Sequence, residues 1–157
     1  MIGKYGSFMP NRTIAERAAH ARNRLSSDHN VWISTGSQDG IPHLVPLSLA
    51  WLDGAIVVAT PSTTPTARNA RASGRARAAL DNADDVVIFD TDVETQPFDD
   101  APTAMVNGYI ESVGWDPRDN PGSWSLLVLR PRTAHVWNGP AEIDGRTIIR
   151  DGRWLDA

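Results

Sequence analysis

Thr64, Thr66 and Arg68 are the side chains whose types and spacing best suit the binding of a ligand. Two hydroxyl groups and a guanidinium stand at every second position, where a helix is expected to begin. The first turn of a helix has unpaired backbone N–H groups, and these attract anions. Together with the hydroxyls and the charge-assisted bond that an arginine offers, they predict a site for a phosphate group.

The helix that would position these groups has signals at both ends. Thr63 or Thr64 can act as the N-cap, Pro65 suits the first helical position, and Gly74 marks the end. The alternative is a capped surface helix without a ligand, whose arginines face water. Those arginines would be Arg68, Arg71, Arg75 and Arg77.

Three apolar segments, 31–35, 42–51 and 55–60, precede this helix and are joined by turn signals. The pairs Asp39-Gly40 and Asp53-Gly54 lie between them, and glycine accepts the positive φ angle that hairpin turns require. We therefore expect two consecutive hairpins, which make an antiparallel meander of three strands.

The middle segment, 42–51, is expected to have a bulky core face and a small face, because side chains alternate along a strand. Pro46 lies on the small face and cannot donate a hydrogen bond, so it belongs at an edge, at a bulge or beside something other than a strand. A flat ligand on that face fits the pattern, and a barrel-corner bulge without a ligand is the alternative. The bulky face comprises His43, Val45, Leu47, Leu49 and Trp51, and the small face Leu44, Pro46, Ser48 and Ala50.

The composition limits the classes of function. A chain of 157 residues with 41% apolar and 22% charged residues suits one globular domain, 1–157. The formal net charge of -4 implies no general attraction to nucleic acid or to an anionic membrane. Cysteine is absent, which excludes disulfides, thiolate metal sites and cysteine nucleophiles.

No segment reaches the roughly 20 apolar residues of a membrane span, and the amino terminus lacks the apolar core of a signal peptide. We therefore expect a cytoplasmic protein. The sequence contains no His-Glu-x-x-His motif and no Ser-His-Asp arrangement. No metal site is expected, and no catalytic residue is identified.

Residues 1–12 are expected to form a flexible arm ahead of a helix. Thr13 and Glu16 match a capping box at the start of that helix. Apolar residues then recur at helical spacing and leave four arginines available to solvent. These are Arg12, Arg17, Arg22 and Arg24.

A further helix is expected to end at Gly114, because Met105, Val106, Tyr109, Ile110 and Val113 share one helical face. The acidic residues from Asp81 to Asp100 are interpreted as a solvated rim rather than a cation site. Strands are expected at 75–80, at 86–89 bounded by Asp90, at 124–129, at 133–137 across the interruption at Pro131, and at 147–149.

Six or seven short, mostly antiparallel strands with peripheral helices predict a mainly β (α+β) fold, a small split β-barrel. Five short runs carry a further signal by their order and spacing: 39–47, 53–54, 59–60, 66–69 and 75–80. In this order they resemble the flavin-binding split barrel of the pyridoxamine 5'-phosphate oxidase-like family. The tail, 129–137 and 145–155, is similar to a subgroup of that family with no settled function. The resemblance covers about Thr13 to Leu155.

This resemblance implies a homodimer that binds FMN, or the related deazaflavin cofactor, in a cleft between subunits. It also implies a flavin-dependent oxidoreductase acting on a small molecule. The isoalloxazine ring would lie along Val45, Pro46, Leu47 and Ser48. The ribityl phosphate would be held by Ala59, Thr60, Thr64, Thr66, Arg68 and Asn69.

The sequence departs from the oxidase members of the family before the helix, where those usually carry a Ser-Arg-Lys-like stretch. Thr64-Pro65-Thr66 stands there instead, without a cation. A phosphate would then depend on helix amides, hydroxyls and Arg68. The alternative functions are a non-enzymatic barrel that binds a flavin or haem-type ligand, a family member without a cofactor, and a regulatory or interaction module.

Overall fold

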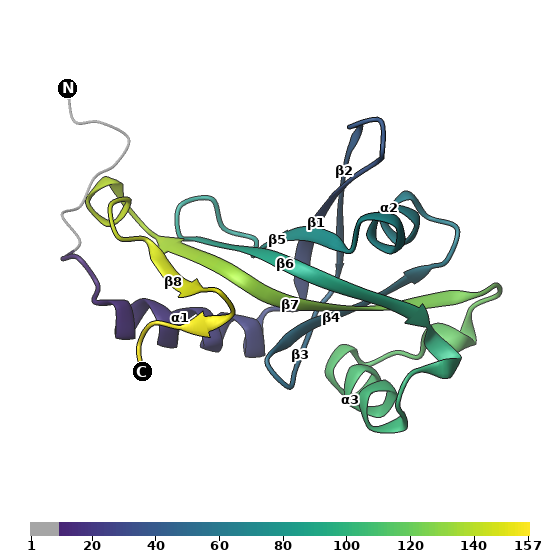
Figure 1. Ribbon diagram of the computed structural model, residues 1–157. Helices are drawn as coiled ribbons and strands as arrows, with labels where there is room; N and C mark the ends of the chain where they lie inside the picture. The colour runs from purple at the N-terminus through teal and green to yellow at the C-terminus, as the bar shows by residue number, and fades with distance from the viewer. Residues whose placement is uncertain (1–9) are drawn as a thin grey trace.

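A single curved sheet forms the centre of the structure, a computed structural model that describes residues 10–157 (Figure 1). Seven strands follow the order β2-β1-β5-β6-β7-β4-β3, with β8 beside β7 and β9 beside β8. The pairings are antiparallel, and the sheet curls so that β2 also approaches β4. The expected α+β split barrel is thereby confirmed. The strands are β1 Asn30–Gly36, β2 Pro42–Ser48, β3 Ala50–Leu52, β4 Ala55–Pro61, β5 Arg75–Ala79, β6 Val86–Pro97, β7 Trp124–Trp137, β8 Thr147–Arg150 and β9 Arg153–Trp154.

The described residues form nine strands, more than the six or seven expected, because three of them are very short. β3, β8 and β9 have three, four and two residues. Each continues the sheet beside a longer strand. Two long strands, β6 and β7, run through the whole molecule and carry the elements at both ends (Figure 1).

Three α-helices lie around this sheet, and their ends follow the sequence signals. α1, Ile14–Ser27, begins with the expected capping box between Thr13 and Glu16. α2, Pro65–Ser73, has Thr64 as its N-cap, and Gly74 ends it in the left-handed conformation. α3, Thr103–Val113, ends at Gly114 in the same way. Three 3-10 helices, η1 Phe98–Asp100, η2 Pro117–Asp119 and η3 Pro140–Glu142, lie in the connections.

Two apolar clusters hold the sheet and helices together. The larger fills the barrel and joins the inner faces of β1, β4, β5, β6 and β7, with Ile33, Phe89 and Leu127 fully buried. The smaller lies on the outer face of β4 and β7, where α3 covers it with Val106 and Tyr109. α2 packs at one end of the barrel against β1, β2, β4 and β6.

The structure corrects the predicted strand over 42–51, which is broken at Leu49. β2 pairs with β1, whereas β3 pairs with β4 on the far edge of the sheet. At the break, the amide of Leu49 donates to the carbonyl of His29 at 2.9 Å. The chain therefore turns a barrel corner between Ser48 and Ala50, and alternation alone does not reveal such a change of partner.

Two other strand boundaries were wrong for a related reason. β6 continues beyond Asp90 to Pro97, and β7 is one strand rather than two. Pro131 and Arg132 form a bulge in β7, because Thr91 pairs with Pro131 while Asp90 pairs with Thr133. A bulge accommodates a proline without ending the strand.

The acidic run, interpreted as a solvated rim, includes members that form ion pairs at the surface: Asp85 pairs with Arg12 at 3.3 Å, and two further members pair within the sheet. Asp90 and Asp92 lie on β6, and cations on adjacent strands neutralise both. Asp90 pairs with Arg77 at 2.8 Å, and Asp92 pairs with Arg132 at 3.1 Å. The predicted rim is therefore partly a cross-strand ladder of ion pairs.

Arg17 and Arg12 are not free in solvent as the helical pattern indicated. Arg17 is buried and donates to the backbone carbonyls of Val136 and Gly145. The amide and guanidinium of Arg12 both donate to the carboxylate of Glu142. The predicted flexible arm is therefore anchored at Arg12, and its residues 1–9 lie outside the described part of the chain.

Candidate functional site

The outer face of β2 is open, as the small-face prediction requires. Pro46 is exposed and Leu44 is 60% exposed, whereas Val45 and Leu47 on the opposite face are half-buried. Leu47 packs against the barrel core. β2 is the terminal strand of the sheet order, so a residue without an N–H is tolerated there. Leu44 is a large apolar residue on this otherwise small face.

The end of β4 and the start of α2 are joined by hydroxyl groups. Thr60 is buried, and its Oγ1 lies 3.1 Å from Oγ1 of Thr64. The Thr64 hydroxyl donates to the carbonyl of Pro61 at 3.0 Å and accepts from the amide of Ala67 at 3.2 Å. The hydroxyl of Thr64 is therefore fully used as a helix cap. Ala59, also in the predicted set, precedes Thr60 on β4, and its side chain is buried on the opposite face of the strand, in the cluster that α3 covers.

Thr66 differs from Thr64, because neither its hydroxyl nor its amide is used. Its side chain is buried, and within the described residues its Oγ1 has no hydrogen-bond partner. No hydrogen bond is found there for its backbone N–H either, whereas the next two amides of the helix bond to Thr64. A buried hydroxyl without a partner costs about 1–3 kcal/mol. The start of α2 thus retains two donors on one residue.

Arg68 and Asn69 place further polar groups around this helix start. The exposed guanidinium of Arg68 folds back and donates to the carbonyl of Thr63 at 2.6 Å. The amide of Asn69 donates to Oγ1 of Thr35 on β1 at 3.2 Å. Arg71, which the sequence reasoning did not include, donates to Ser125 at 3.4 Å. One arginine therefore lies beside the first turn and another along the following one.

Two tryptophans border the open face of β2, and sequence reasoning missed both. Trp32 is the cross-strand partner of Pro46, so its half-buried side chain lies on the same face. Trp115, which follows α3, donates its indole N–H to Oγ of Ser48 at 3.4 Å. Nothing in the spacing of Ser48 and Trp115 links them, since 67 positions separate them. The strand pairing that places Trp32 was likewise not predicted in register.

Three solved structures share this arrangement of sheet and helices. A protein named F420 reductase matches 72% of this chain and 94% of its own, with 17% identity and a TM-score of 0.58. A Clostridium acetobutylicum protein described as belonging to the pyridoxinephosphate oxidase family matches 78% of this chain and 89% of its own, with 10% identity and a TM-score of 0.60. A heme-binding protein from Mycobacterium smegmatis matches 92% of this chain but 60% of its own, with 18% identity and a TM-score of 0.65.

This chain has the split-barrel fold of the pyridoxamine 5'-phosphate oxidase-like proteins. The resemblance drawn from the sequence motifs is confirmed at the level of the fold, which is what likeness at such identities establishes. No family model and no curated protein sequence matches the chain. The assignment of the ten residues to a cofactor site therefore stays a prediction. The structure shows only where these residues lie in the split barrel.

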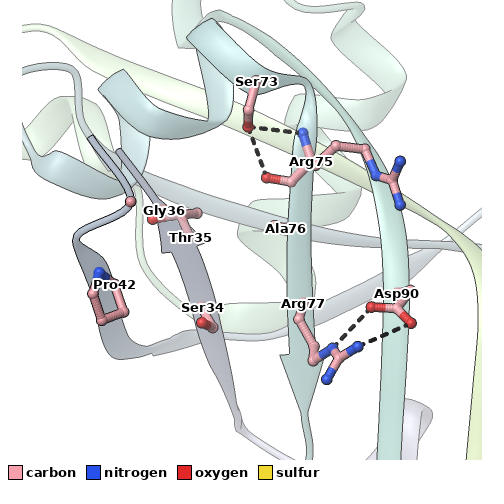
Figure 2. Close-up of a pocket in the computed structure, with 10 residues that line it drawn as sticks. Ser34, Thr35, Gly36, Pro42, Ser73, Arg75, Ala76, Arg77 and Asp90 are labelled. Atoms are coloured by element: carbon pink, nitrogen blue, oxygen red, sulfur yellow. Dashed lines mark hydrogen bonds and ion pairs between the residues drawn. The ribbon is translucent and has the colours of Figure 1, made fainter. Parts of the chain in front are cut away.

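A groove in the described part of the chain is lined by residues other than the predicted cofactor set (Figure 2). It measures about 470 Å³ and opens where β1 and β5 diverge, since β1 pairs with β5 only up to Ser34 but with β2 as far as Gly36. Arg77 in its wall is paired with Asp90, and Ser73 bonds the backbone of Arg75. None of the ten predicted cofactor residues lines this groove.

The two histidines on strands, which are candidate haem ligands, are far apart in the sheet order. His43 is on β2 and His135 is on β7, with β1, β5 and β6 between them. The imidazole of His135 contacts the hydroxyl of Thr147 at 3.2 Å. Burial, with a contribution from Arg146, lowers its pKa. Within the described residues, no three His, Asp or Glu side chains gather as metal ligands. No described helix has the length and apolar character to span a bilayer.

Proposed function

We propose that this chain is a flavin- or deazaflavin-dependent oxidoreductase of the pyridoxamine 5'-phosphate oxidase-like family, acting on a small molecule. The ring of the cofactor lies on the face of β2 around Pro46, and its phosphate lies at the start of α2. One observation carries the proposal: at the start of α2, a helix that contacts β2, Thr66 keeps both of its donors without partners within the described residues.

The residues at the helix start fit a phosphate. A phosphate oxygen there would accept from the amide of Thr66. The Thr66 hydroxyl is buried, so it would gain the phosphate as a partner once its side chain rotates toward the ligand. The guanidinium of Arg68, held against Thr63, contributes a charge-assisted bond worth about 1.5–3 kcal/mol. Thr60 and Thr64 hold the helix start in place rather than bind the phosphate themselves. Asn69 ties α2 to β1 beside it through Thr35. Ala59 lies in the sheet next to Thr60, so its backbone rather than its side chain would border the phosphate.

The residues around Pro46 fit a flat ring. Pro46 has no backbone N–H, so a ring that covers it buries no unpaired hydrogen-bond donor at this position. Leu44 and Pro46 leave an apolar strip exposed, and a second copy of the chain would cover it together with the ring. A homodimer with the cofactor at the interface follows from this proposal. Val45, Leu47 and Ser48 fix the strand beneath the ring.

When bound, the cofactor supplies hydride transfer, and the protein supplies orientation and exclusion of water. This explains why no catalytic triad is needed in the chain. Cytoplasmic location is part of the same proposal, because nicotinamide donors for such reactions are found there.

Absorption titrations with FMN and with the deazaflavin test the proposal. We expect one of the two to saturate at micromolar concentration and to be reduced by a nicotinamide donor. Saturation without reduction would favour the non-enzymatic carrier, a role that the heme-binding neighbour of this fold also suggests. Titration with hemin would then examine a haem-type ligand. No binding of either flavin would contradict the proposal.

A further inference from the structure

Trp115 lies at the end of the strand face on which the ring is proposed to rest. Its indole N–H donates to Oγ of Ser48, the last residue of β2. Ser48 and Pro46 are two positions apart, so they share a face of the strand and lie roughly 7 Å apart along it. Trp115 therefore borders the same open face at the corner where the chain leaves β2.

The indole is held firmly by other aromatic rings. Trp124 packs edge-to-face against it with centroids 5.6 Å apart, and Tyr109 does so at 6.4 Å. Tyr109 is fully buried and packs in turn against Phe98 at 5.9 Å. Burial raises the pKa of Tyr109 to about 12, so its ring stays neutral and apolar. Trp115 itself is half-buried, so the residue keeps some exposed surface.

The contact with Trp115 also determines which hydrogen bonds the Ser48 hydroxyl can still form. A serine hydroxyl has one donor and two acceptor positions, and the indole N–H takes one acceptor position. The Ser48 proton is then free to donate to an acceptor lying on the Pro46 face. A heteroaromatic ring with nitrogen or carbonyl acceptors at its edge is the chemical class that matches a flat strand, an aromatic border and one hydroxyl donor.

We infer that Trp115 is a positioning residue for the ring: its indole forms the wall of the ring site and orients the Ser48 hydroxyl toward the ring edge. This inference rests on the proposed function and adds a residue from the segment after α3 to the site. It also implies that the packing of Tyr109 and Trp124 against Trp115 keeps the Trp115 indole in place.

The test measures flavin binding and flavin emission separately for matched variants. Trp115→Phe keeps a ring but removes the N–H and the strongly quenching indole, and Trp115→Leu removes the ring as well. Trp154→Phe is the control, because Trp154 is also half-buried but contacts Arg22 near the C-terminus. Ser48→Ala removes the hydroxyl while leaving the aromatic group intact. Thermal melting establishes that each variant folds.

At saturation with whichever flavin binds, we expect stronger flavin emission from Trp115→Phe than from the unchanged protein and from Trp154→Phe. Trp115→Leu should bind about tenfold more weakly, as the loss of one aromatic contact predicts. Ser48→Ala should shift the absorption maximum of the bound flavin and gives a reading even if the Trp115 variants fold poorly.

Equal emission, affinity and absorption in all of these proteins would overturn the role of Trp115 while leaving the proposed function intact. Failure of the unchanged protein to bind either flavin would overturn both.

Discussion

The hydroxyl groups of Thr60 and Thr64 lie 3.1 Å apart and tie the end of β4 to the first turn of α2. Since Thr64 also donates to Pro61 and accepts from Ala67, the Thr60 hydroxyl must be the donor in this pair. The helix start is thus fixed to the sheet before any ligand arrives. Preorganisation of this kind lowers the entropic cost of holding an anion at a helix terminus.

Thr64→Ala should destabilise the fold by about 1 kcal/mol, because the helix loses its N-cap. Thr64→Ser keeps the capping oxygen and should restore most of that stability. Urea unfolding monitored by circular dichroism measures both. Equal stability of the alanine variant and the unchanged protein would show that the cap contributes little here.

Thr66→Val, unlike Thr64→Ala, should not lower the stability of the fold. Valine replaces an unpaired buried hydroxyl by a methyl group of the same shape, so the free energy of unfolding should stay the same or rise by about 1 kcal/mol. FMN affinity should nevertheless fall, since the phosphate loses a donor. Stability and affinity measured on the same preparation separate the two effects, and a variant with undiminished affinity would remove the Thr66 hydroxyl from the site while leaving its backbone amide untested.

Arg68→Gln should weaken FMN binding by roughly tenfold or more, the loss expected for one charge-assisted bond. Riboflavin has no phosphate, so its affinity should change little. Isothermal titration of both ligands provides this comparison, and Arg153→Gln, at an exposed position of β9, is the matched control. Parallel losses for both flavins would mean that Arg68 does not serve the phosphate.

Glu142 should make stability depend on acid pH. Its burial raises its pKa, but hydrogen bonds from Arg12 and Asn138 outweigh burial and hold the pKa at about 2, against 4.5 ordinarily. A lowered pKa stabilises the fold above pH 4.5, and this contribution is lost as the pH falls toward 2.

Arg12→Gln should therefore cost about 2–3 kcal/mol at pH 7, and the difference from the unchanged protein should shrink below pH 4.5. Urea titrations at pH 7, 4.5 and 3 measure it. Arg132→Gln removes an exposed ion pair instead and should cost under about 1 kcal/mol at every pH. A difference that does not vary with pH would contradict the assignment to Glu142.

Leu44→Lys should shift the proposed dimer toward monomers, because a charge would replace an apolar side chain that is 60% exposed. Sedimentation velocity over a range of concentrations detects the shift. Gln38→Lys, in the exposed turn before β2, serves as the control of equal charge. If the unchanged protein sediments as a monomer, the interface is absent and the ring site must be complete within one chain.

Much of the local structure follows from the sequence because it depends on neighbours along the chain. The capping box at Thr13, the N-cap at Thr64 and the glycine stops at Gly74 and Gly114 are all present. The alternation of arginine and alanine correctly indicated β5. The caps and stops involve bonds between residues at most a few positions apart, and β5 shows the two-residue alternation of a half-buried strand, so spacing along the chain suffices to predict them.

The misplaced features all depend on partners far away in the chain. The break at Leu49 arises because β2 and β3 pair with different strands, and the burial of Arg17 arises from carbonyls more than 100 positions along. The continuity of β7 through Pro131 depends on its long pairing with β6. The pattern of side chains along a strand does not indicate which distant strand will pair with it.

The sequence by itself determined a capped helix with two threonines and an arginine at its start and a strand with a small face around Pro46. Its many short, mostly antiparallel strands with peripheral helices also predicted the split barrel. Only the tertiary structure decided which of those groups keep free donors, that Thr66 does so while Thr64 does not, and that Trp32 and Trp115 border the strand. The reason is physical: residue type and spacing specify which donors exist, whereas packing between distant segments specifies which of them are already satisfied.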